Sequence, residues 1–251
     1  MKFSVCTDIV FPDIQTFEAM KIVKDSGYDY FEFWGWWNKD IDAIKKASKD
    51  LDIKLAALCT RFISLTNPLV RDEYICGLYE TIEVCKKLSC PLIISQVGND
   101  TLKSREEQLE SLIDGLKSAA LILKESGITL VIEPLNTKYD HKGYFLSSSS
   151  EAAWVVDQVK SPNIKMLFDF YHQQITEGDI INNSVKYIDK IGHFHCAGNP
   201  GRHELNYGEI DYKEVFKALK AAGYGDCIGF EYKPLESKKS VKTLINLYKD
   251  I

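Results

Sequence analysis

The 251-residue sequence contains no apolar run close to the roughly 20 residues that a helix needs to span a bilayer. It also lacks an excess of basic residues, because 36 aspartates and glutamates outnumber 31 lysines and arginines and leave a net charge of −5. These absences argue against a membrane or a nucleic acid as the main partner. Neither absence excludes a small-molecule substrate, which meets only the local charge of a cleft.

The seven cysteines include no C-x-x-C pair, and their number is odd. We therefore expect reduced thiols, and neither a disulfide framework nor a zinc site built on paired cysteines. The N-terminal stretch FSVCT (residues 3–7) reads as a strand and is too short for the apolar region of a signal peptide. Both observations predict a cytoplasmic protein.

Short apolar runs recur along the chain, and amphipathic segments separate them. Each run carries few charges before its C-terminal end, as is typical of strands buried on both faces of a parallel sheet. The predicted strands span residues 2–6, 28–33, 53–59, 91–97, 128–134, 164–170, 191–197 and 227–233. Helices are predicted over residues 13–26, over residues 105–126, and from Asp211 to Gly223. The first of these is predicted to place Phe17, Met20, Ile22 and Val23 on one face.

Eight strands that alternate with helices over 251 residues match the size of a (β/α)₈ TIM barrel. A doubly wound open sheet is the competing topology, but the first strand–helix turn, CTDIVFPD, has no Gly-x-Gly-x-x-Gly phosphate loop. No Pro/Gly/Ser-rich linker divides the chain. The sequence therefore predicts one barrel domain over residues 1–251.

The last four predicted strands each end on a polar side chain after an apolar run. These residues are Glu133, Asp169, His195 and Glu231. Any one of them could meet solvent or cap the next helix, but in a barrel all four would converge on one mouth. Three carboxylates buried together would repel one another unless a cation joined them. The set suits one divalent metal ion such as Mn²⁺, Mg²⁺ or Co²⁺, and Zn²⁺ is also compatible.

Other side chains near the predicted mouth could contact a substrate. His193 lies two residues before His195 on the same strand face, so we expect it to support His195 from deeper in the barrel. Arg202 could bind a carboxylate or enediolate oxygen, or pair with Glu204. Trp34, in EFWGWW (residues 32–37), could wall off a small substrate or pack at a subunit contact.

Several segments at these positions carry a family resemblance. They are IEPLNTK (132–138), HKGYFL (141–146), LFDFYHQQITEGD (167–179), IGHFHCAGNPGRHELNYGEIDY (191–212) and GFEYKP (229–234). Together they resemble the hydroxypyruvate isomerase family of the xylose isomerase-like TIM barrels, which is related to the ketose 3-epimerases.

The resemblance implies residue roles. Glu133, Asp169, His195 and Glu231 would be the metal ligands, and Glu133 and Glu231 would also be the catalytic acid/base pair. His172 and Arg202 would hold substrate oxygens. Bacterial hydroxypyruvate isomerases often carry glutamine where this chain has His195, whereas histidine is usual in the 3-epimerases. This departure favours a metal site and leaves the substrate open.

The predicted activity is therefore a metal-dependent isomerisation or epimerisation of a small hydroxy-carbonyl compound or ketose, through an enediolate and two glutamates. A non-catalytic sugar-binding barrel and a polyol dehydratase remain alternatives. Phosphodiester hydrolysis is disfavoured, because the endonucleases with this type of barrel use histidine-rich sites and a basic surface, and this chain has five histidines and a net charge of −5. A homo-oligomer stays open.

Overall fold

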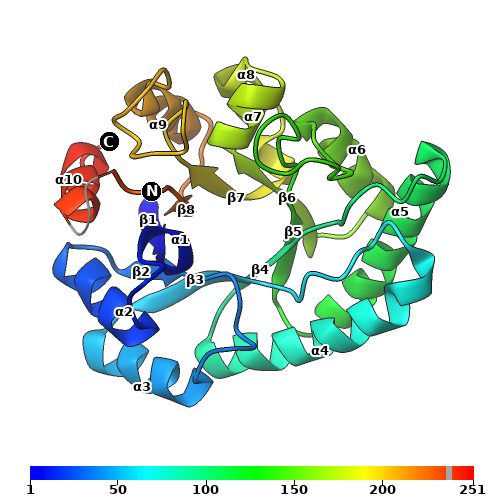
Figure 1. Cartoon of the computed structure of the whole chain (residues 1–251), viewed down its shortest axis with the longest axis horizontal. Coiled ribbons are helices and arrows are strands. Elements are labelled where there is room, and N and C mark those ends of the chain that lie inside the picture. Colours follow the sequence, from blue (N-terminus) through cyan, green and yellow to red (C-terminus); the bar gives the residue numbers. More distant parts are fainter. Residues whose placement is uncertain (236–238) are drawn as a thin grey trace.

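The computed structural model describes residues 1–235 and 239–251, and at its centre a parallel sheet closes into a barrel (Figure 1). The strands are β1 (Lys2–Cys6), β2 (Tyr30–Glu32), β3 (Lys54–Cys59), β4 (Leu92–Ser95), β5 (Thr129–Ile132), β6 (Ile164–Asp169), β7 (Ile191–Cys196) and β8 (Cys227–Phe230). Each strand pairs with the next, and β1 also pairs with β8. The predicted (β/α)₈ barrel is confirmed, and the open sheet is wrong.

Helices surround the barrel (Figure 1). They are α1 (Thr7–Val10), α2 (Thr16–Asp25), α3 (Ile41–Leu51), α4 (Arg71–Leu88), α5 (Arg105–Leu123), α6 (Ser149–Val159), α7 (Phe170–Thr176), α8 (Ile180–Lys186), α9 (Tyr212–Ala221) and α10 (Lys239–Tyr248), with 3₁₀ turns η1 (Pro68–Val70) and η2 (Ile188–Lys190). Within the described ranges, no helix is long and apolar enough to cross a membrane.

Several strands end earlier than their apolar runs predict, and local chemistry explains where. β5 stops at Ile132, one residue before Glu133, because Pro134 has no backbone N–H to continue the ladder. β4 stops at Ser95, and the backbone N–H of Val97 donates instead to the Tyr144 hydroxyl at 2.8 Å. The polar residues at these ends are thereby released from strand pairing into the mouth of the barrel.

Helix α2 differs from its prediction. It begins at Thr16, and its buried face contains Met20 and Val23, whereas Phe17 is 55% exposed. At 100° per residue, Phe17 lies about 120° around the helix from Val23, which places it outside the buried stripe. The prediction that Phe17 shares one helix face with Met20 and Val23 is therefore wrong. The serine run at 147–150 caps α6, because the Ser148 hydroxyl accepts the backbone N–H of Glu151.

Aromatic rings fill the layer between the last strands and the last helices. Phe216 of α9 is fully buried, with ring centroids 5.4 Å from Phe3, 5.2 Å from Tyr248 and 5.6 Å from Tyr212. The ring of Phe3 also lies 5.1 Å from that of Phe230 in β8, so these contacts fix α9 and α10 against β1 and β8. They support β8 directly before the point where the chain delivers Glu231 to the mouth.

Replacing Phe216 with alanine should lower the free energy of unfolding by about 3–5 kcal/mol, because a fully buried ring is lost and a cavity remains. Urea unfolding measures the change. Phe17→Ala is the matched control, and it should change stability by no more than about 0.5 kcal/mol, since that ring is half exposed. Equal losses in the two variants would contradict this account of the core.

Candidate active site

Four predicted ligands meet at the C-terminal ends of consecutive strands. Glu133 directly follows β5, Asp169 is the last residue of β6, His195 lies on β7 and Glu231 directly follows β8. One ligand atom of each lies within 4.8 Å of those of the others, and all four side chains are buried. The barrel therefore brings three carboxylates and one imidazole into a single cluster.

The carboxylate of Glu231 is the most heavily bonded of the three. The indole Nε1 of Trp34 donates to Oε1 at 2.6 Å, and the guanidinium of Arg202 forms an ion pair with Oε2. His195 Nδ1 lies 3.5 Å from the same Oε2. Burial alone would raise the pKa of Glu231, but the positive charge of Arg202, followed by that of His195, holds it well below its usual range.

The other two carboxyl groups have few partners. Burial, and then the charge of Glu231, raise the pKa of Glu133 to about 8. Burial also raises the pKa of Asp169, to about 6, against the opposing charge of Arg202. The same cluster therefore contains one carboxyl group that is strongly held in its ionised form and two that resist ionisation.

Unpartnered atoms in the cluster test whether it suits a cation. Glu133 Oε1, Asp169 Oδ2 and His195 Nδ1 are buried and have no hydrogen-bond partner. Buried polar atoms without partners are uncommon and destabilising. A divalent cation would satisfy all three together, and carboxylate oxygens with one imidazole nitrogen form a donor set suited to Mn²⁺, Mg²⁺ or Co²⁺. The residues therefore fit a metal ion.

Glu32, at the end of β2, is a buried residue of this site that the sequence analysis missed. Its Oε2 lies 3.0 Å from His195 Nε2, and its Oε1 lies 3.0 Å from His193 Nε2. Although burial raises its pKa, the two histidines hold the pKa of Glu32 well below its usual range. The sequence signal for Glu32 was a charged residue in the otherwise apolar C-terminal part of the strand predicted over residues 28–33. Its partner on β7 cannot be read from the sequence.

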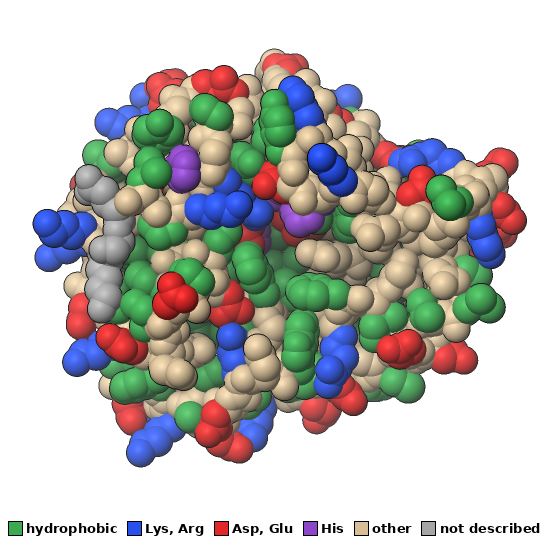
Figure 2. Space-filling view, in the orientation of Figure 1, with side chains coloured by type: hydrophobic (Ala, Val, Ile, Leu, Met, Phe, Trp, Pro, Cys, Tyr) green, Lys and Arg blue, Asp and Glu red, His purple; other side chains and the backbone are tan. Residues whose placement is uncertain are grey.

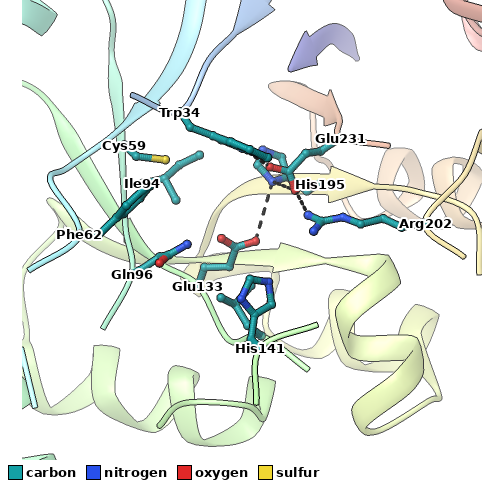
Figure 3. Close-up of a pocket in the computed structure, with 11 residues that line it drawn as sticks. Trp34, Cys59, Phe62, Ile94, Gln96, Glu133, His141, His195, Arg202 and Glu231 are labelled. Carbon is teal, nitrogen blue, oxygen red and sulfur yellow. Dashed lines mark hydrogen bonds and ion pairs between the residues drawn. The ribbon is translucent and has the colours of Figure 1, made fainter. Parts of the chain in front are cut away.

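A cavity of about 190 Å³ opens beside the ligand cluster. The molecule is hollowed near the centre of this face, where charged and histidine side chains gather beside hydrophobic ones (Figure 2). The residues that line this cavity are Trp34, Cys59, Phe62, Ile94, Gln96, Glu133, Leu135, His141, His195, Arg202 and Glu231 (Figure 3). Trp34, Cys59, Phe62 and Ile94 lie on one side together with Gln96, and the charged and histidine side chains lie on the other (Figure 3).

The three predicted substrate contacts occupy different positions. Trp34 and Arg202 line the cavity. His172, in α7, is completely buried and is absent from the lining residues. Its Nδ1 lies 2.7 Å from the side-chain amide of Asn136, and its Nε2 lies 3.6 Å from Asp169 Oδ2. His172 thus lies behind the ligand cluster in this structure.

His141 also lines the cavity, together with His195, although the sequence did not indicate a role for it. Its ring lies 5.2 Å from that of His172, and its backbone N–H donates to the Asn136 carbonyl oxygen at 3.1 Å. Burial lowers its pKa, and the charge of Arg202 lowers it further. Its segment, HKGYFL, carried the family resemblance, but its approach to the cavity depends on the fold of the loop after β5.

Comparison with known proteins identifies relatives over almost the whole chain. A family model described as "Xylose isomerase-like TIM barrel" matches residues 20–250. The hydroxypyruvate isomerase of Escherichia coli (strain K12) is 30% identical over 244 residues, which cover 93% of this chain and 94% of the relative. The 2-oxo-tetronate isomerase of Cupriavidus necator is 38% identical over 135 residues, which cover 54% of this chain and 50% of the relative.

Solved structures with the same fold include a protein from Brucella melitensis described as an AP endonuclease of family 2. It superposes with a TM-score of 0.94 at 25% identity, over 98% of each chain. The D-psicose 3-epimerase of Clostridium cellulolyticum H10, solved with D-tagatose, has a TM-score of 0.86 at 17% identity and covers 100% of this chain and 99% of that one. At 17% identity this second likeness concerns the fold alone.

The raised pKa of Glu133 predicts that the metal-free protein loses stability as the pH rises from about 6.5 to 8. Over this range the folded state keeps a proton on Glu133, with its pKa of about 8, that the unfolded state has already released. His195 contributes in the same direction, because interactions with Glu231 and Glu32 outweigh burial and raise its pKa well above the usual value.

Glu133→Gln removes one of these protons, so it should reduce the loss of stability by about 1.4 kcal/mol per pH unit. Urea unfolding in EDTA between pH 6.5 and 8 measures this slope. His172, whose pKa is lowered by burial and then by Arg202, contributes in the opposite direction up to about pH 7, but it does so in both proteins and does not obscure the comparison. Parallel profiles for the wild type and the variant would contradict the assignment.

Proposed function

The chain belongs to the xylose isomerase-like TIM-barrel family, and from this membership we propose that it is a metal-dependent isomerase or epimerase of a small hydroxy-carbonyl compound. Its relatives include isomerases that act on hydroxypyruvate and on 2-oxo-tetronate, according to their names. The proposed reaction removes a proton from the carbon atom beside a carbonyl group and returns a proton to that carbon or to the neighbouring one. One divalent cation, Mn²⁺, Mg²⁺ or Co²⁺, would be bound by Glu133, Asp169, His195 and Glu231.

The observation that supports this proposal best is the set of unpartnered ligand atoms. Glu133 Oε1, Asp169 Oδ2 and His195 Nδ1 lie in one buried cluster and lack hydrogen bonds. A purely structural cluster would be expected to pair these atoms with one another or with neighbouring donors. When bound there, a divalent cation supplies electrostatic stabilisation for negative charge that develops on substrate oxygens.

The two glutamates are proposed to carry the proton. They directly follow β5 and β8 and approach the cavity from different sides (Figure 3). One glutamate takes the proton from the carbon beside the carbonyl group, and the bonding electrons pass to the carbonyl oxygen to give an enediolate. Return of the proton to the neighbouring carbon, together with transfer of the hydroxyl proton of the first carbon to the former carbonyl oxygen, gives an isomer. Delivery by the other glutamate to the opposite face of the first carbon gives an epimer.

The remaining predicted residues would position the substrate and the glutamates. We propose that Trp34 and Arg202 contact the substrate from the cavity wall while they hold the carboxylate of Glu231 in place. The predicted substrate contact of His172 remains a proposal, and it would act through its Nε2 beside Asp169. The cavity of about 190 Å³ is smaller than the roughly 300–1,000 Å³ of drug-sized pockets, which favours a substrate of few carbon atoms.

Proton exchange at carbon tests the proposal. The protein is incubated in D₂O with Mn²⁺ and hydroxypyruvate, erythrulose, ribulose, fructose or tagatose, and the spectra are followed by NMR. We expect deuterium to enter the carbon beside the carbonyl group of at least one compound, and EDTA should stop the exchange. Bound metal without exchange of any compound would instead favour a non-catalytic sugar-binding barrel.

Glu133→Gln should lower the exchange rate by about 10²- to 10⁴-fold, because it removes a proton acceptor from the reacting carbon. Glu106→Gln, on an exposed position of α5, is the matched control and should keep the wild-type rate. Circular dichroism checks that both variants are folded. A folded Glu133→Gln protein with the wild-type exchange rate would refute the role given to this residue.

A further inference from the structure

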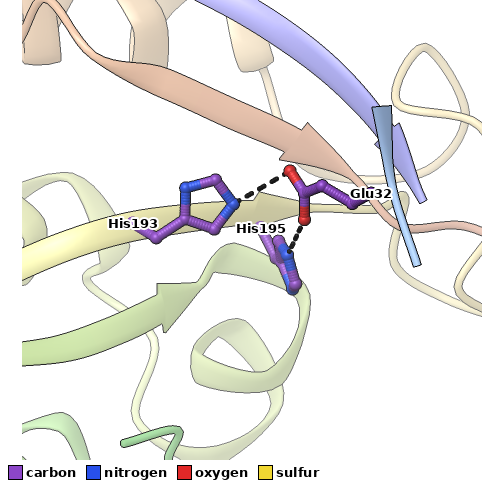
Figure 4. A group of neighbouring side chains, drawn as sticks. All are labelled: Glu32, His193 and His195. Carbon is purple, nitrogen blue, oxygen red and sulfur yellow. Dashed lines mark hydrogen bonds and ion pairs between the residues drawn. The ribbon is translucent and has the colours of Figure 1, made fainter. Parts of the chain in front are cut away.

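Glu32 is a buried carboxylate surrounded by hydrogen-bond donors (Figure 4). Its Oε1 lies 3.0 Å from His193 Nε2 and also accepts the hydroxyl of Ser4, and its Oε2 lies 3.0 Å from His195 Nε2. An ionised carboxylate can only accept hydrogen bonds. Both histidines must therefore carry a proton on Nε2 when they bind Glu32.

This hydrogen bond determines which atom of His195 faces the candidate metal site. With Nε2 occupied by Glu32, the other ring nitrogen, Nδ1, lies 3.5 Å from Glu231 and 3.9 Å from Glu133. Nδ1 is buried and has no hydrogen-bond partner. Glu32 therefore directs the free nitrogen of His195 toward the carboxylate cluster.

The neighbouring strand leaves room for the contact between Glu32 and His195. Gly229 of β8 lies opposite His195 in the barrel ladder. A Cβ atom at position 229 would come within 2.7 Å of both Glu32 Oε1 and His195 Cδ2. Any larger residue there would push the carboxylate and the imidazole apart. Glycine at this position thus permits their close approach.

We infer that Glu32 is a positioning residue that fixes the orientation and the tautomer of His195, so that Nδ1 is presented as a metal ligand. The inference rests on the proposed metal site. A histidine ligand whose second nitrogen bonds to a carboxylate is held in one tautomer and becomes a more basic ligand. Glu32 would never touch the ion or the substrate.

His193 provides an internal comparison. It binds the same carboxylate at the same distance of 3.0 Å, but it lies deeper in the barrel and is outside the four-residue ligand cluster. Replacing Glu32 or His193 breaks a buried hydrogen bond in either case. Only the Glu32 replacement removes the carboxylate that binds Nε2 of His195.

A second metal ion bound by Glu32, His193 and His195 is the rival interpretation, because their ligand atoms also lie within 4.8 Å of one another. In this group, however, both carboxylate oxygens and both Nε2 atoms already have hydrogen-bond partners. The cluster at the cavity contains unpartnered atoms instead. The geometry therefore favours a supporting role for Glu32.

Calorimetric titration with Mn²⁺ tests the inference on the full-length wild type, Glu32→Gln and His193→Gln. Glu32→Gln should weaken Mn²⁺ binding by about 10- to 100-fold, as the loss of such a supporting carboxylate does elsewhere. His193→Gln should lose thermal stability to a similar extent but keep an affinity close to that of the wild type. Equal affinities for the wild type and Glu32→Gln, or two ions per wild-type chain, would overturn the inference.

A second measurement needs no variant to fold. In ¹⁵N-histidine-labelled wild type loaded with Zn²⁺, which is diamagnetic, long-range ¹H–¹⁵N spectra should show His195 protonated on Nε2. A proton on Nδ1 would overturn the inference. If the wild type binds neither metal, the proposed function fails, but the same spectrum of the metal-free protein still reports whether Nε2 carries the proton that faces Glu32.

Discussion

Mutual repulsion among the buried carboxyl groups of Glu133, Asp169 and Glu231 is the constraint on which the rest of the site depends. Their ligand atoms lie within 4.8 Å of one another together with that of His195, in a region that water scarcely reaches. Like charges at such distances in a poorly solvated site strongly disfavour simultaneous ionisation. Burial, followed by the charge of Glu231, raises the pKa of Glu133, and the same two effects raise the pKa of Asp169 against the opposing charge of Arg202.

The surrounding residues offset this repulsion unequally. Arg202 and Trp34 both bind Glu231, which leaves its neighbours with fewer partners. On the far side, Glu32 takes the second nitrogen of His195. The barrel is what makes this arrangement possible, because parallel strands deliver these side chains to one mouth from positions far apart in the chain. The buried atoms that remain without partners, Glu133 Oε1, Asp169 Oδ2 and His195 Nδ1, form a site suited to a cation.

The sequence predicted much of the fold and the clustering of Glu133, Asp169, His195 and Glu231 for a common physical reason. Strands buried on both faces are continuous apolar runs, so the first polar residue after each run marks the mouth, as at Asp169 and Glu231. Glu32 escaped this reasoning because its partners, His193 and His195, lie more than 160 residues away. His141 depends on a loop conformation, and the burial of His172 depends on packing that periodicity does not encode.

The most direct test of the central claim is the position of a bound ion. Crystals grown with Mn²⁺ and measured at the manganese absorption edge should show one anomalous peak per chain. The peak should be coordinated by Glu133, Asp169, Glu231 and the Nδ1 atom of His195. An anomalous map with no peak among these residues, at saturating Mn²⁺, would contradict the account.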